Sequence, residues 1–169
     1  MKMTELFLAQ LEAEGPKTRR SVEHAPEGRD DWKPHPTSMP LGRLVMLVAG
    51  MPAWIAMVIH DDHLDLNPPA GKGQGPPAMP TQADRLKAVD EGVAKARAAL
   101  TGTTDEHLLK PWRLMVAGKV VSEQPRHVVL RDTFMHLSHH RGQLTVYLRM
   151  NEVPVPAIYG PSADESRFD

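Results

Sequence analysis

One stretch decides the predicted fold: residues 126–151, RHVVLRDTFMHLSHHRGQLTVYLRMN. Its large apolar residues recur at three- and four-residue spacing, which is typical of the buried face of an α-helix. The predicted core positions are Leu130, Phe134, Leu137, Leu144 and Leu148. Because a proline precedes this stretch and can begin a helix, we expect one long helix that ends at about Asn151.

Three more helices are predicted upstream, at about residues 5–24, 38–61 and 81–102. The second is apolar on almost every side, as expected of a central helix that is covered by its neighbours. The third begins with Thr81 and Asp84 at the spacing of a capping box, in which each side chain binds the other residue's backbone N–H. These patterns predict four helices that pack on one another.

The remaining segments are short or irregular. Residues 112–123, WRLMVAGKVVSE, place two apolar runs on either side of Ala117-Gly118, which predicts a β-hairpin. Residues 66–80 are rich in proline and glycine and are expected to form a long crossover between the second and third helices. We therefore predict an all-α fold, a four-helix bundle with a small β-hairpin inserted before the last helix. Residues 1–169 are expected to form a single domain.

Composition and charge exclude several classes of protein. Hydrophobic residues make up 41% and charged residues 24% of the chain, as in ordinary globular proteins. Twenty basic and 21 acidic residues give a net charge of −1 without any basic run, which argues against a nucleic-acid partner. Cysteine is absent, so disulfides, thiolate ligands and a cysteine nucleophile are excluded.

The apolar segments do not indicate a membrane protein. The N-terminus carries glutamates within its apolar region, unlike a signal peptide. The most apolar run, residues 44–59, contains Pro52 and is shorter than the ~20 residues that a membrane span needs. We expect a soluble, cytoplasmic protein with no membrane partner.

The chemical focus of the sequence is the pair His136 and His140 in the motif HLSHHRGQL. Residues four apart on a helix are neighbours, so these two imidazoles can point at one location. Zinc binds imidazole nitrogens at about 2.0–2.1 Å. We therefore predict His136 and His140 as ligands of a divalent metal, in a pocket between the helices. The alternative is a pair of partly buried histidines that only form hydrogen bonds, and nine histidines in the chain make a chance pairing easy.

Arg141 lies in the middle of the apolar stripe of the last helix. A buried charge needs a partner, because its removal from water is costly. Two roles remain open for Arg141. It can contact an anion or substrate, or it can form a salt bridge to an acid on another helix or on a second subunit.

Two segments resemble a known family. Residues 136–165, HLSHHRGQLTVYLRMNEVPVPAIYGPSADE, resemble the C-terminal part of the DinB-like (YfiT/DinB) superfamily. Residues 32–44, WKPHPTSMPLGRL, are similar to the loop and the beginning of the second helix in that family. The HHRGQL and YGPS segments are the most specific parts of the resemblance.

The resemblance implies a four-helix bundle, often a homodimer, that holds one divalent metal through three histidines. Two of these histidines correspond to His136 and His140. Some members transfer thiol cofactors to electrophiles, so the expected function is that of a metal-dependent thiol transferase or hydrolase. Zinc or nickel is the expected cofactor, a small-molecule ligand is an expected partner, and the substrate and catalytic residues stay unassigned.

The sequence departs from the family pattern at one ligand position. Aligned on LGRL, the third histidine of the family falls on Leu47, which cannot bind a metal. The metal can be lost, a loop histidine such as His35 or His63 can replace the ligand, or a weak and water-rich site can survive. The alternative function is therefore that of a metal-free, non-catalytic relative that acts as a binding or dimeric scaffold module.

Overall fold

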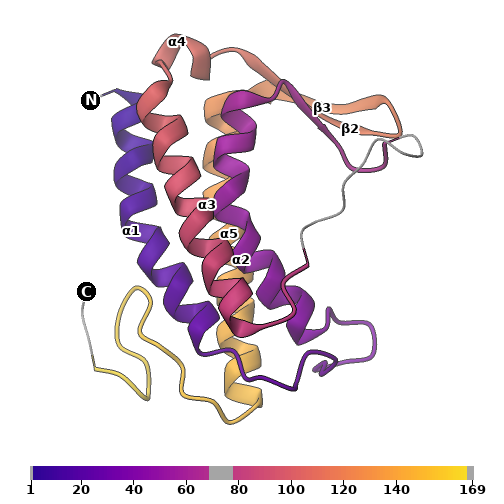
Figure 1. The fold of residues 1–169 in the computed structure, drawn as a ribbon, viewed down its shortest axis with the longest axis vertical. Helices are drawn as coiled ribbons and strands as arrows, with labels where there is room; N and C mark the ends of the chain where they lie inside the picture. The colour runs from indigo at the N-terminus through magenta and orange to yellow at the C-terminus, as the bar shows by residue number, and fades with distance from the viewer. Residues whose placement is uncertain (1, 69–77, 167–169) are drawn as a thin grey trace.

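The computed structural model describes residues 2–68 and 78–166. It is mostly helical, with a small sheet (Figure 1). In chain order its elements are α1 (Met3–Glu23), α2 (Leu41–His60), β1 (His63–Asp65), α3 (Gln82–Gly102), α4 (Asp105–Leu108), β2 (Pro111–Val116), β3 (Lys119–Pro125) and α5 (Arg126–Met150). Part of the predicted crossover, residues 69–77, lies outside the described residues.

The four long helices lie side by side (Figure 1). α2 packs against α3 and α5, and α1 packs mainly against α3. α2 and α3 run in the same direction, whereas α1 and α5 run in the opposite direction (Figure 1). The sheet and α4 lie together at the end of the helices where α1 begins. The chain therefore returns to the opposite end of the molecule between β1 and the beginning of α3.

The position of α2 explains its composition. By length and hydropathy alone this helix is apolar enough to cross a membrane. In the structure it contributes to both apolar clusters of the core, with Val45 and Val48 in one and Ile55 and Val58 in the other. An apolar helix that is covered by neighbours on several sides is expected at the centre of a packed protein.

The beginnings of the helices follow their capping residues. α3 begins as predicted, because the Asp84 N–H donates to the Thr81 hydroxyl (3.1 Å) and the Thr81 N–H donates to the Asp84 carboxylate (3.1 Å). α2 begins at Leu41 rather than near Ser38, since Pro40 is the N-cap and lies outside the first turn.

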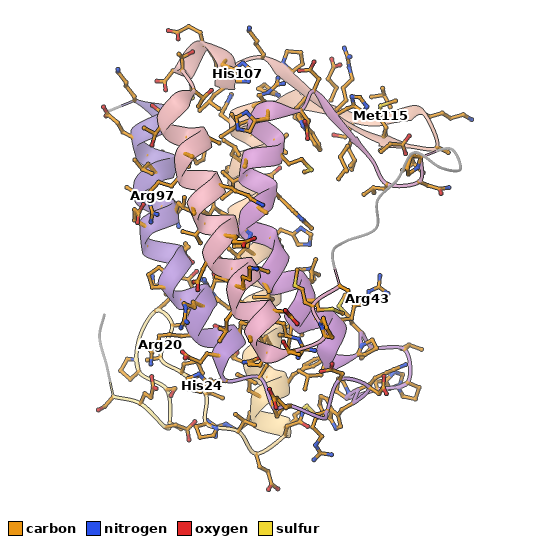
Figure 2. The ribbon with its side chains drawn as sticks, viewed as in Figure 1. Arg20, His24, Arg43, Arg97, His107 and Met115 are labelled. Atoms are coloured by element: carbon orange, nitrogen blue, oxygen red, sulfur yellow. The ribbon has the colours of Figure 1, made fainter. Side chains whose placement is uncertain are left out.

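The short helix α4 was not predicted, and it holds the beginning of α1. The Asp105 carboxylate of α4 accepts the N–H groups of Met3 (2.9 Å) and Thr4 (3.0 Å), which are free at a helix start. His107 of α4 donates from Nε2 to the carbonyl of Ile59 at the end of α2 (2.8 Å). Figure 2 shows His107 at the end of the molecule where α4 lies. α4 therefore joins the beginning of α1 to the end of α2.

The sheet has one strand more than the predicted hairpin. β2 and β3 pair antiparallel around Ala117 and Gly118, both of which have positive φ. β1 pairs parallel with β2, with His63 opposite Arg113. Asp65 then accepts the N–H groups of Ala117 (3.0 Å) and Gly118 (2.7 Å), so β1 holds the hairpin turn. The fold is thus mostly helical with a three-stranded sheet.

α2 and α3 approach each other closely where Pro52 faces Gly92. A Cβ atom on Gly92 would lie 3.0 Å from the backbone nitrogen of Ala53 and 3.3 Å from the Cβ of Pro52. Proline inside a helix lacks an N–H and removes one backbone hydrogen bond. The contact therefore needs a residue without a side chain in α3, next to the irregular turn of α2.

A buried ion pair joins α5 to α1. Arg141 is only 1% exposed, and its guanidinium donates to the carboxylate of Glu14, which is also buried. It also donates to the hydroxyl of Thr18 (3.1 Å), and the Tyr159 hydroxyl donates to Glu14 (2.9 Å). Of the two roles left open for Arg141, the structure shows the salt bridge to an acid on another helix.

The C-terminal tail packs back over the helices. Arg20 of α1 lies beside it (Figure 2), and donates to the carbonyl of Ala157 (3.3 Å) and the carboxylate of Glu165 (2.5 Å). Arg149 pairs with Asp164 in the same way (2.5 Å). These contacts place Tyr159 over the Arg141–Glu14 pair.

We predict that Arg141→Met lowers the free energy of unfolding by about 3 kcal/mol, because Glu14 then stays buried without its main cationic partner. The expected loss is at the lower end of the usual range, since Lys17 remains 3.6 Å from Glu14. Urea denaturation at neutral pH measures the loss. The double variant Glu14→Gln/Arg141→Met removes the unpaired buried charge and should regain part of the lost free energy of unfolding. A double variant that is no more stable than Arg141→Met contradicts this explanation.

Candidate functional site

His136 and His140 converge as the spacing predicts. Their Nε2 atoms lie 2.8 Å apart, and their ring centroids lie 4.5 Å apart. Two imidazole nitrogens on one tetrahedral zinc ion would lie about 3.3 Å apart, given bonds of about 2.0–2.1 Å. A chelating pair would therefore need the two rings to rotate slightly apart and the hydrogen between them to leave Nε2 of His136.

The pair lies at the protein surface beside α2. His136 is exposed and His140 is half-buried, so the prediction that they face an internal pocket is wrong. The indole of Trp54 in α2 forms one wall, with its ring centroid 5.9 Å from that of His136.

Gln143 determines which nitrogen of His140 carries the hydrogen. The Nδ1 atom of His140 lies 2.7 Å from the Gln143 side-chain oxygen, which can only accept. Nδ1 is therefore protonated, and Nε2 keeps its lone pair and accepts from the Nε2–H of His136. A metal-binding histidine usually donates its second N–H to an oxygen in this way. The sequence motif contains Gln143 at i+3 from His140, a spacing that could have revealed this contact.

The pKa of His136 is lowered from its usual value. The largest cause is desolvation, because the imidazole is partly removed from water although the residue as a whole is exposed, and positive charge on His140 and His139 adds to it. A lowered pKa favours the neutral imidazole near pH 7, which is the form that binds a metal ion.

Leu47 lies where the family pattern expects a third ligand. It is partly buried against the core, two turns before Trp54 and so on the same side of α2. Of the two histidines considered as replacements, His35 hydrogen-bonds to Thr37 (2.8 Å), and His63 lies in β1. Within residues 2–68 and 78–166, no group of three or more His, Cys, Asp or Glu side chains could hold a metal ion. The donor set at this place is two imidazoles.

A cavity of about 270 Å³ lies on the other side of α5, under the tail. Its lining includes Ser138, Arg141 and Tyr159, but neither histidine of the pair. The Ser138 and Tyr159 hydroxyls are hydrogen-bonded to each other (3.0 Å). The cavity is therefore separate from the histidine pair.

Solved structures of the same architecture exist. A DinB-like protein from Bacillus cereus ATCC 10987 matches with a TM-score of 0.69 and 19% identity, over 92% of this chain and 97% of that one. The chain has the DinB-like fold. A second DinB-like protein, YjoA from Bacillus subtilis, matches with a TM-score of 0.66 and 20% identity, over 96% of this chain and 99% of that one. The DinB-like resemblance is thus confirmed at the level of the fold.

Sequence similarity is more limited. The uncharacterized protein YrdA of Bacillus subtilis (strain 168) is 42% identical over 43 residues, which is 25% of this chain and 26% of that protein. The match thus spans about a quarter of each protein. No protein-family model matches the chain.

We predict that the free energy of unfolding falls below neutral pH, in part through His136. Its folded pKa is lowered, so the unfolded chain, with a pKa of about 6.5, binds the proton first. The stability is present above about pH 6.5 and is lost as the pH falls toward the lowered folded pKa.

Urea denaturation between about pH 7.5 and 5.5, with a chelator present, tests this prediction. His136→Gln should show a shallower decline than the unsubstituted protein. His60→Gln, at the exposed end of α2, is the matched control and should keep the original slope. Equal slopes for the unsubstituted protein and His136→Gln would show that His136 does not contribute.

Proposed function

We propose that this protein is a DinB-like four-helix bundle that binds a divalent cation weakly through His136 and His140. The observation that supports the proposal is the convergence of the two Nε2 atoms at 2.8 Å, with His140 oriented by Gln143. Imidazole nitrogens suit zinc and nickel. Two of them leave the coordination shell incomplete, so water or a small-molecule ligand would fill the remaining positions.

The chain's own residues would have separate roles at this site. His136 and His140 would hold the ion, Gln143 would keep the His140 lone pair directed at it, and Trp54 would exclude water from one side. A bound divalent ion supplies Lewis-acid chemistry, which lowers the pKa of a bound water or thiol. The proposed reaction class is therefore hydrolysis or thiol transfer. A cytoplasmic location without nucleic-acid or membrane partners is part of the proposal.

The second candidate is a metal-free binding or scaffold module. Leu47 favours it, because a partly buried apolar side chain that packs against the core stands where the family has its third ligand. Zinc sites in proteins normally use at least three protein ligands, so two imidazoles give low affinity. Metal binding by the purified protein distinguishes the two candidates.

Titration of zinc or nickel into tag-free protein, followed by calorimetry, tests the first candidate. We expect one weakly bound ion per chain. His140→Ala should remove binding, and Gln143→Leu should weaken it by about tenfold because His140 loses its orienting partner. His139→Ala, on the neighbouring exposed residue, is the matched control and should bind normally. No binding by the unsubstituted protein would reject this candidate in favour of the metal-free one.

Leu47→His restores the third imidazole of the family pattern and should tighten metal binding by about tenfold or more. Leu47→Gln is the matched control, since it makes a similar polar change without adding an imidazole. The same calorimetric titration measures both variants, and circular dichroism confirms their helix content. If Leu47→His folds and binds no more tightly than Leu47→Gln, then position 47 does not face the histidine pair.

A further inference from the structure

The cavity under the C-terminal tail has two different walls. One wall is a side of α5, on which Ser138, Gly142 and Thr145 follow one another at helical spacing. The other wall is the tail, and its side chains there are mainly apolar, among them Val155, Ile158 and Pro161. At about 100° per residue, this side of α5 is turned away from His136 and His140. The cavity is therefore a second place where a ligand could bind, independent of the proposed metal site.

Hydrogen bonds fix the tail wall in position. The hydroxyl of Ser162 donates to the carbonyl of Val155 (2.6 Å). It also accepts the N–H groups of Asp164 (3.1 Å) and Glu165 (3.0 Å). The carboxylates of these two residues in turn accept the N–H groups of Val155 (2.8 Å) and Ala157 (2.9 Å). The tail wall is thus ordered by its own contacts, as is usual for the walls of a small-molecule site.

The direction of each hydrogen bond around Tyr159 is determined by its partners. Arg141 can only donate to the Tyr159 hydroxyl, and the carboxylate of Glu14 can only accept from it (2.9 Å). A phenol has a single hydrogen, which is therefore used on Glu14. The Ser138 hydroxyl lies 3.0 Å from the same oxygen and must then donate to it. Ser138 keeps its lone pairs, so it is a hydrogen-bond acceptor for a molecule in the cavity.

Thr145 offers the same chemistry from the next turn of α5. Its hydroxyl donates to the carbonyl of Gly142 (2.7 Å), so its hydrogen is also used within the protein. Arg141 adds one donor, because its buried Nε has no hydrogen-bond partner within the described residues. The charge of its guanidinium is balanced by Glu14. An uncharged group that both donates and accepts suits this lining, and a hydroxyl is such a group.

We propose that this cavity binds a small neutral alcohol or phenol whose apolar body is about the size of an aromatic ring. The ligand hydroxyl would donate to Ser138 or Thr145, and its ring would pack against the apolar side chains of the tail. The cavity volume of about 270 Å³ suits such a molecule, since a cavity of about 150 Å³ can hold benzene. A carboxylate would suit it less well, because it has no hydrogen to donate to the two hydroxyls.

Titration with benzyl alcohol and with its isomer anisole, followed by amide NMR spectroscopy, tests the proposal. The two molecules contain the same atoms, but anisole has no hydroxyl hydrogen. Benzyl alcohol should cause saturable shifts in the signals of Gly142 and Gly160, which line the cavity. It should bind about threefold to tenfold more tightly than anisole, which is the usual effect of one hydrogen bond. The double variant Ser138→Ala/Thr145→Val should remove this difference and leave the affinity for anisole unchanged.

Gly142→Phe tests whether the ligand lies in the cavity. A Cβ atom at Gly142 would meet nothing within 4 Å in the described part of the chain, so an added ring can take the place of the ligand. This variant should lose the binding of benzyl alcohol and keep its helix content. Gly102→Phe is the matched control and should bind normally, because a Cβ atom there is equally free of described neighbours and lies outside the cavity lining.

Three results would overturn the proposal. The first is the absence of saturable shifts in the unsubstituted protein. The second is an equal affinity for benzyl alcohol and anisole, which would show that the hydroxyl is not recognised. The third is binding that Gly142→Phe leaves intact, which would place the ligand elsewhere on the protein.

Discussion

The guanidinium of Arg141 connects three parts of the chain that are distant in sequence. It donates to Glu14 and Thr18 of α1, and Tyr159 of the tail contacts both members of the ion pair. A buried charge without partners is strongly unfavourable, so the helix cannot turn about its axis without breaking these hydrogen bonds. The rotation of α5 is thereby fixed. The same rotation places His136 beside Trp54 of α2.

Much of the fold was predictable because its signals are local. The apolar spacing of α5, the capping box at Thr81 and the two runs around Ala117-Gly118 each lie within a few residues of the element they specify. The features that the sequence did not predict depend on residues that are far away along the chain. β1 has three residues and exists as a strand because it pairs with β2. The first turn of α1 is capped by Asp105, about a hundred residues away, which no local pattern records.

The candidate site was predictable only in part, for a related reason. Helical spacing alone brings His136 and His140 together, and the structure confirms that their rings meet. Their exposure could not be predicted, because it depends on how far α2 extends over that side of α5. The orienting role of Gln143 was within reach of the sequence. The departure at Leu47 was visible in the resemblance, and the structure adds that this leucine packs against the core.

Gly92 and Pro52 have a consequence for the sequences that this fold can accept. The α3 backbone rests directly on the turn of α2 that contains the proline, and a Cβ atom at position 92 would lie only 3.0 Å from the backbone nitrogen of Ala53. A lineage that acquires a larger residue at position 92 must therefore move the two parallel helices apart or reshape that turn. The two positions are coupled, so substitutions at one are expected to accompany substitutions at the other during divergence.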